Sequence, residues 1–131
     1  MKKHTHTILI VDDEEMIRAV LSQLLTKDGY NILQAEDGVA AIKACAGQNV
    51  NLIITDLVMP GKNGIDLIME LKRSQGNIPI IAISGGGGIK GAFDYLSVAK
   101  LIGAQEIFPK PIDLEKLKNT VATLLGIPPV K

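Results

Sequence analysis

The sequence predicts one α/β domain, in which a parallel β-sheet carries helices on both faces. Five short apolar runs alternate with five segments of helical periodicity along the 131 residues, and this alternation is typical of a doubly wound fold. Two runs, Ile8–Val11 and Leu52–Ile54, are apolar at every position, as strands buried on both faces should be. Right-handed crossovers leave few ways to wind five such strands, and the order 2-1-3-4-5 is favoured.

The five predicted strands are short and rich in apolar residues. They are Thr7–Val11, Asn31–Ala35, Asn51–Thr55, Pro79–Ile83 and Gln105–Phe108. The first and last helices are predicted from apolar residues three and four positions apart, which share one helix face. These residues are Ile17, Val20, Leu21, Leu24 and Leu25 in the first helix, and Leu114, Leu117, Val121, Leu124 and Leu125 in the last. The three helical patterns between them are looser, and they cover Val39–Cys45, Ile65–Leu71 and Phe93–Ile102.

A glycine lies at or just past the end of each helical pattern. Glycine adopts the left-handed conformation of a helix C-cap at little cost, and the expected caps are Gly29, Gly47, Gly76, Gly103 and Gly126. The sequence predicts a domain over residues 7–125 with tails at 1–6 and 126–131. No linker or repeat divides it.

The composition excludes several classes of protein. Fourteen basic residues balance fourteen acidic ones, so there is no basic field for nucleic acid or an anionic membrane. No apolar run approaches membrane-spanning or signal-peptide length, and a cytoplasmic protein without membrane insertion is expected. The only cysteine, Cys45, is expected to be a small buried residue. His4 and His6 are expected to lie in a solvated tail.

Acidic residues follow two predicted strands that are neighbours in this order. Asp12 and Asp13 follow the first strand, and Asp56 follows the third. Ligands of doubly wound folds bind at the carboxyl ends of the strands, where the winding reverses between strands 1 and 3. Three carboxylates there need a cation, and oxygen ligands without His or Cys favour Mg²⁺. Asp12 or Asp13 could instead cap a helix, but Asp56 precedes a segment that cannot start one.

Two further strands bring a hydroxyl and an ammonium group to the same edge. Ser84 follows the fourth strand, and Lys110 follows the fifth. Alone, the serine reads as a turn residue and the lysine as a surface charge. Together with a metal and Asp56 they form what a transferring phosphoryl group needs, with Asp56 as nucleophile and Ser84 and Lys110 binding phosphoryl oxygens.

These motifs resemble the receiver domain of two-component response regulators. The resemblance covers about Thr7 to Leu125 and rests on ILIVDDE, LIITDLVMPGKNG, IIAIS and FPKP. It implies a flavodoxin-like (βα)5 domain, similar to a stand-alone chemotaxis regulator. It further implies a phosphoryl acceptor that is not a turnover enzyme, although its own pocket catalyses transfer and hydrolysis.

The resemblance also assigns the site residues. Asp56 would accept the phosphoryl group from a histidine kinase or a phosphotransfer protein. Mg²⁺ would be held by Asp12, Asp13, Asp56 and the backbone carbonyl of Val58, with Asp13 the more direct ligand.

The resemblance assigns the switch as well. Lys110 would bind phosphate and form a cis bond to Pro111. Ser84 would move to the phosphoryl group while Phe108 turns inward. The downstream partner is an unknown protein, reached through residues 90–101 and 108–117, and a phosphorylation-dependent dimer is also expected.

The stretch SGGGGIKG departs from the family and raises an alternative. Gly86, Gly88 and Gly91 match G-x-G-x-x-G, with Glu106 twenty residues after the first of them, as in dinucleotide-binding folds. That loop, however, follows strand 4, and Glu106 is expected inside strand 5. A Walker loop fails because Ala92 follows Gly91. We expect instead a hinge whose glycines let the backbone path change as the preceding serine moves.

Three positions leave the phosphoryl lifetime open. The family often has alanine at Gly85, and it commonly has polar groups at Val58 and Gly86. A haloacid dehalogenase-type phosphatase is disfavoured because it needs a general acid at Val58. A receiver-like binding module without phosphorylation is disfavoured because the acceptor, metal and phosphate-binding residues are all present.

Overall fold

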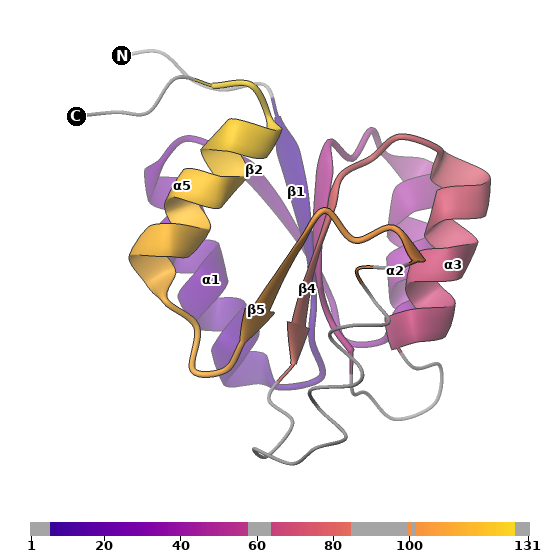
Figure 1. Cartoon of the computed structure of the whole chain (residues 1–131), viewed down its shortest axis with the longest axis horizontal. Helices are drawn as coiled ribbons and strands as arrows, with labels where there is room; N and C mark the ends of the chain where they lie inside the picture. Colours follow the sequence, from indigo (N-terminus) through magenta and orange to yellow (C-terminus); the bar gives the residue numbers. More distant parts are fainter. Residues whose placement is uncertain (1–5, 58–63, 85–99, 101, 128–131) are drawn as a thin grey trace.

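The computed structural model describes residues 6–57, 64–84, 100 and 102–127, and they form one parallel sheet with helices on both faces (Figure 1). The strand order is β2-β1-β3-β4-β5, as predicted. The strands are β1 (Thr7–Val11), β2 (Asn31–Ala35), β3 (Leu52–Asp56), β4 (Ile80–Ser84) and β5 (Glu106–Pro109). In the described residues, no helix is long and apolar enough to cross a membrane.

The helices lie in two pairs on opposite faces of the sheet. Helices α1 and α5 cover one face, and α2 and α3 cover the other (Figure 1). Their bounds are α1 (Glu15–Lys27), α2 (Gly38–Gly47), α3 (Gly64–Gln75) and α5 (Leu114–Leu124). The predicted helix at 93–102 falls largely outside the described residues.

Strands β3, β4 and β5 each begin and end one residue later than predicted. The ladder pairs Asp56 with Ile83 and Ser84 with Pro109, because backbone pairing does not require an apolar side chain. Asp56 and Ser84 are therefore the last residues of buried strands, and each is paired with a neighbouring strand.

Side-chain caps and glycines account for most helix ends. The carboxylate oxygens of Asp37 and Asp113 accept hydrogen bonds from the third residue of α2 and α5, respectively. Positive φ angles occur at Gly29, Gly76, Gly103 and Gly126, as predicted. The prediction for Gly47 is wrong: it ends α2, and Gln48 continues in extended backbone with φ −145°, so no left-handed residue is needed.

Two apolar clusters hold the sheet between its helices. Alternate residues of β1 face opposite sides: Leu9 and Val11 join the cluster under α2 and α3, and Ile8 and Ile10 join the one under α1 and α5. Cys45 is buried in the first cluster, as expected. A sheet packed on both faces is a rigid support for side chains at its carboxyl edge.

Candidate functional site at the carboxyl edge of the sheet

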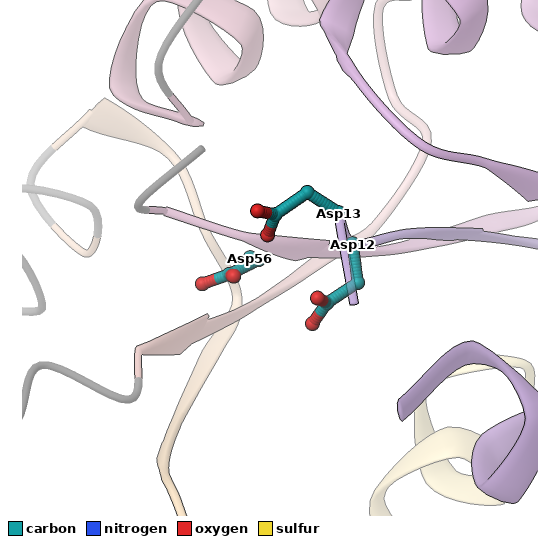
Figure 2. A group of neighbouring side chains, drawn as sticks. All are labelled: Asp12, Asp13 and Asp56. Carbon is teal, nitrogen blue, oxygen red and sulfur yellow. The ribbon is translucent and has the colours of Figure 1, made fainter. Parts of the chain in front are cut away.

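Three aspartates from two adjacent strands meet at the carboxyl edge. Figure 2 shows Asp12 and Asp13 just beyond β1 and Asp56 at the end of β3, with their carboxylates directed to the same side. One carboxylate oxygen of each lies within 4.8 Å of those of the others. Asp12 and Asp56 are buried and Asp13 is exposed, so the group reaches solvent at Asp13.

The backbone around these aspartates is fixed by the sheet. The Asp12 amide donates to the Ala35 carbonyl over 3.1 Å, and the Leu57 amide donates to the Ile83 carbonyl over 2.9 Å. Neither Asp12 nor Asp13 is the N-cap of helix α1, which is the alternative role considered for them, because the N-cap residue is Glu14. Oδ1 of Asp12 accepts a 2.8 Å hydrogen bond from the Glu14 amide, which leaves its second oxygen directed to the site.

An arginine that sequence reasoning missed ties helix α1 to the end of β1. Nη1 of Arg18 donates to the Asp12 carbonyl over 2.7 Å, and its Nε donates to Oε1 of Gln34 over 3.2 Å. The guanidinium thus joins the first turns of α1 to two strands. Its only sequence signal is a position one helical turn past the acidic run.

Lys110 places its ammonium group between carboxylates. Its Nζ lies 3.3 Å from Oδ2 of Asp12, 3.3 Å from Oε2 of Glu14 and 3.5 Å from Oδ2 of Asp56. The predicted cis bond to Pro111 is present. The sequence placed the lysine and two of these carboxylates at one edge, but it gave no role to Glu14.

The electrostatics of this group are unbalanced. Burial raises the pKa of Asp12, and the hydrogen bond from Glu14 and the Lys110 charge offset that only in part. Burial lowers the pKa of Lys110, but the charges of Asp56, Asp12 and Glu14 outweigh this and leave the pKa raised. Lysine therefore stays protonated, while the Asp12 anion remains costly.

One ammonium does not neutralise this cluster, and a divalent cation would. The aspartates supply oxygen atoms alone, which suits a hard ion such as Mg²⁺. The donor set therefore fits the predicted metal. The further ligand predicted at Val58 lies outside the described residues.

Ser84 and Phe108 lie on the paired strands β4 and β5, close to the carboxyl edge, and both are buried. Ser84 is 2% exposed, and within the described part of the chain its Oγ has no hydrogen-bond partner. Phe108 pairs with Ile83 in the β4–β5 ladder and is 3% exposed. Nζ of Lys116 lies 5.7 Å from the centre of its ring. The glycine loop after Ser84 lies outside the described residues.

Gly64 is a second position that sequence reasoning missed. A Cβ there would lie 2.4 Å from Cα of Leu57 and 2.5 Å from the carbonyl oxygen of Asp56. The Gly64 amide also donates to the Leu57 carbonyl over 2.9 Å. The start of α3 therefore packs directly on the backbone of the central aspartate, and no side chain fits between them. Gly64 is the last residue of the motif LIITDLVMPGKNG, but the motif alone does not predict this close contact.

The acid of the dinucleotide alternative lies at the wrong edge. Glu106 is the first residue of β5, at the amino end of a parallel strand. The carboxyl edge, where Asp12, Asp56 and Lys110 meet, is the opposite one.

Comparison with known proteins identifies the family. The family model for the response regulator receiver domain matches residues 8–122. The chain therefore belongs to the receiver domains of two-component response regulators.

Two curated relatives contain a segment similar to this chain, in one case as nearly the whole protein and in the other as a small part of it. The chain is 31% identical over 120 residues to sporulation initiation phosphotransferase F of Bacillus subtilis (strain 168), covering 92% of this chain and 94% of that protein. It is 34% identical over 123 residues to the CAI-1 autoinducer sensor kinase/phosphatase CqsS of Vibrio cholerae, with 92% of this chain covered. The chain spans only 17% of the length of that protein.

Solved structures agree with the fold. A response regulator receiver domain protein from Clostridium thermocellum has a TM-score of 0.84 at 26% identity, covering 92% of this chain and 94% of that one. The receiver domain of the TMAO respiratory system response regulator TorR has a TM-score of 0.81 at 30% identity, covering 92% and 97%.

Proposed function

We propose that Asp56 accepts a phosphoryl group from a histidine kinase or a histidine phosphotransfer protein, and that this switches a protein-interaction surface. The observation that carries the proposal is the convergence of Asp12, Asp13 and Asp56 within 4.8 Å, with the Lys110 ammonium 3.5 Å from Asp56. Membership of the receiver family supports the same chemistry.

In the proposed transfer, a carboxylate oxygen of Asp56 attacks phosphorus in line with the leaving nitrogen of a phosphohistidine. The N–P bond breaks as the new O–P bond forms, and the histidine nitrogen keeps the electron pair and takes up a proton. Lys110 donates N–H groups to the phosphoryl oxygens. Asp12, Asp13 and Asp56, with the Val58 carbonyl, would hold Mg²⁺, which supplies neutralisation of charge on those oxygens.

Ser84 and Phe108 would carry the switch. A buried hydroxyl without a partner in the described residues is an available donor for a phosphoryl oxygen. Movement of Ser84 would change the space beside Phe108, and the glycines that follow Ser84 would act as the hinge. The predicted output surface is residues 90–101 and 108–117.

An apolar groove next to Lys110 supports a docking side for the phosphodonor protein. An apolar groove of about 250 Å³ runs from Lys110 along α1. It is lined in part by Met16, Val20 and Leu114, which are 75%, 42% and 37% exposed. A partner protein seated there would lie beside Lys110, whose Nζ is 3.5 Å from Oδ2 of the acceptor Asp56.

The remaining assignments stay predictions. These are a domain over residues 7–125 with tails at 1–6 and 126–131, and an unknown downstream protein partner rather than nucleic acid. They also include a phosphorylation-dependent dimer, a cytoplasmic location without membrane insertion, and no enzymatic turnover beyond the domain's own transfer and hydrolysis.

The test is phosphorylation by acetyl phosphate with Mg²⁺, followed by intact mass. One phosphoryl group should be added to the parent and none to Asp56→Asn, and chelation should stop labelling. Asp66→Asn, at an exposed aspartate of α3, is the matched control and should label normally. Undiminished labelling of Asp56→Asn would overturn the assignment.

A further inference from the structure

A third carboxylate, which no strand end predicts, contacts the site lysine. Oε2 of Glu14 lies 3.3 Å from Nζ of Lys110, as close as Oδ2 of Asp12. The Glu14 side chain is 60% exposed, whereas that of Asp12 is 2% exposed. The ammonium therefore has carboxylate neighbours inside the site and one on its solvent side.

Glu14 differs from the other neighbours of Lys110 in its chemistry. Asp12 and Asp56 face the metal and the phosphoryl group, so both stay near the lysine throughout the proposed reaction. Glu14 contributes to neither. An ammonium has only three N–H donors, and three carboxylates already lie within 3.5 Å of this one. A phosphoryl group on Asp56 therefore competes with them, and Glu14 is the one that the proposed reaction does not use.

We propose that Glu14 is a counter-ion that holds Lys110 in the unphosphorylated protein and thereby slows phosphoryl transfer to Asp56. The inference rests on the proposed function, and Glu14 is a positioning residue because it acts through Lys110. Once the phosphoryl group has taken the ammonium, Glu14 no longer contacts it. Glu14 therefore affects formation of the phosphorylated state and leaves its loss unchanged.

The length of the Glu14 side chain decides whether the contact forms. The Glu14 amide donates to Oδ1 of Asp12 over 2.8 Å, and its carbonyl accepts from the Arg18 amide over 3.2 Å. With the backbone held on both sides, an aspartate here would withdraw the carboxylate by about 1.5 Å, one C–C bond. That places it beyond hydrogen-bonding distance of Lys110 while keeping its charge.

The experiment compares the parent with Glu14→Gln, Glu14→Asp and Glu15→Gln. The last removes a charge from the adjacent exposed residue at the start of α1. The rate constant for phosphorylation by acetyl phosphate with saturating Mg²⁺ and the rate of phosphoryl loss are measured for each. Exchange of the Lys110 ammonium protons with water is followed by ¹⁵N NMR in the unphosphorylated proteins.

Both Glu14 variants should phosphorylate about threefold faster, the size expected of one partly exposed ion pair. Both should lose the phosphoryl group at the parent rate and exchange the Lys110 protons faster, and Glu15→Gln should match the parent throughout. A faster Glu14→Gln with an unchanged Glu14→Asp would assign the effect to charge alone and overturn the proposal. So would parent values for both. If the parent itself fails to label, the proposed function is wrong, and the proton exchange still decides whether Glu14 holds Lys110.

Discussion

The amide of Lys110 donates a 3.0 Å hydrogen bond to the carbonyl oxygen of Ser84. The two residues proposed to bind the phosphoryl oxygens are thus joined through the main chain at the ends of β4 and β5. A displacement of the Ser84 backbone would therefore also displace or break its hydrogen bond with the Lys110 backbone.

Ser84→Ala should abolish the response to phosphorylation without lowering the free energy of unfolding. Its Oγ is buried and has no hydrogen-bond partner in the described residues, so removing it should leave the free energy of unfolding unchanged or raise it by up to about 1 kcal/mol. The variant should still accept a phosphoryl group but lose the phosphorylation-dependent NMR shifts of Phe108–Leu117.

Ser74→Ala is the control, since that exposed hydroxyl donates only to the Glu70 carbonyl of its own helix. Equal distal shifts in parent and Ser84→Ala would count against the proposed switch.

Gly64→Ala should damage the site by moving the backbone of its acceptor. The new Cβ would overlap Leu57 Cα and the Asp56 carbonyl, both closer than 3.0 Å. Overpacking against backbone should lower the free energy of unfolding by about 1–3 kcal/mol and slow labelling of Asp56. Urea unfolding and the labelling assay check both effects.

The matched substitution is Gly47→Ala, which would meet nothing within 4 Å at the end of a helix. It should be neutral or stabilising, by up to about 1 kcal/mol. Similar losses in both variants would show that Gly64 has no special constraint.

Asp12→Asn should change how stability depends on pH. Burial raises the pKa of Asp12 in the folded protein above its ordinary value of 3.8. Between pH 3.8 and the raised pKa, the folded protein therefore binds more protons than the unfolded chain. Stability contributed by this group therefore falls as the pH rises through that window. Without divalent ions at pH 7, the variant should be more stable by on the order of 1 kcal/mol.

This advantage should shrink as the pH falls through that window towards 3.8. At pH 7, saturating Mg²⁺ should reverse it, because only the parent then gains from binding the ion. Urea titrations across the pH range measure it, with Asp66→Asn as the exposed control. A parent more stable than Asp12→Asn at pH 7 without metal would contradict the argument.

Arg18→Ala should weaken metal binding without removing a ligand. The guanidinium holds the Asp12 carbonyl at 2.7 Å, and loss of such support commonly lowers metal affinity by about tenfold or more. Titration with Mg²⁺, followed by NMR, measures the affinity. Arg73→Ala, at an exposed arginine of α3, should keep the parent value, and an unaltered affinity in Arg18→Ala would rule out this role.

Alternation and strand-end chemistry were enough to predict the sheet order and the residues that meet at its edge. The ends of β3 and β4 were placed one residue early because Asp56 and Ser84 are polar, although the ladder includes both. Glu14 and Gly64 could not be predicted in this way. The role of Glu14 depends on a side-chain rotamer, and that of Gly64 on the close approach of the start of α3 to the end of β3. Neither has a periodic signal.

The chain has equal numbers of acidic and basic residues, yet the carboxylates of Asp12, Glu14 and Asp56 surround Lys110 at one edge of the sheet. This group of described residues thus carries a net negative charge at that edge. Retention on an anion-exchange column should follow the charge of this group. A bound divalent cation should advance elution. A phosphoryl group should delay it, because it replaces the single negative charge of the Asp56 carboxylate with almost two.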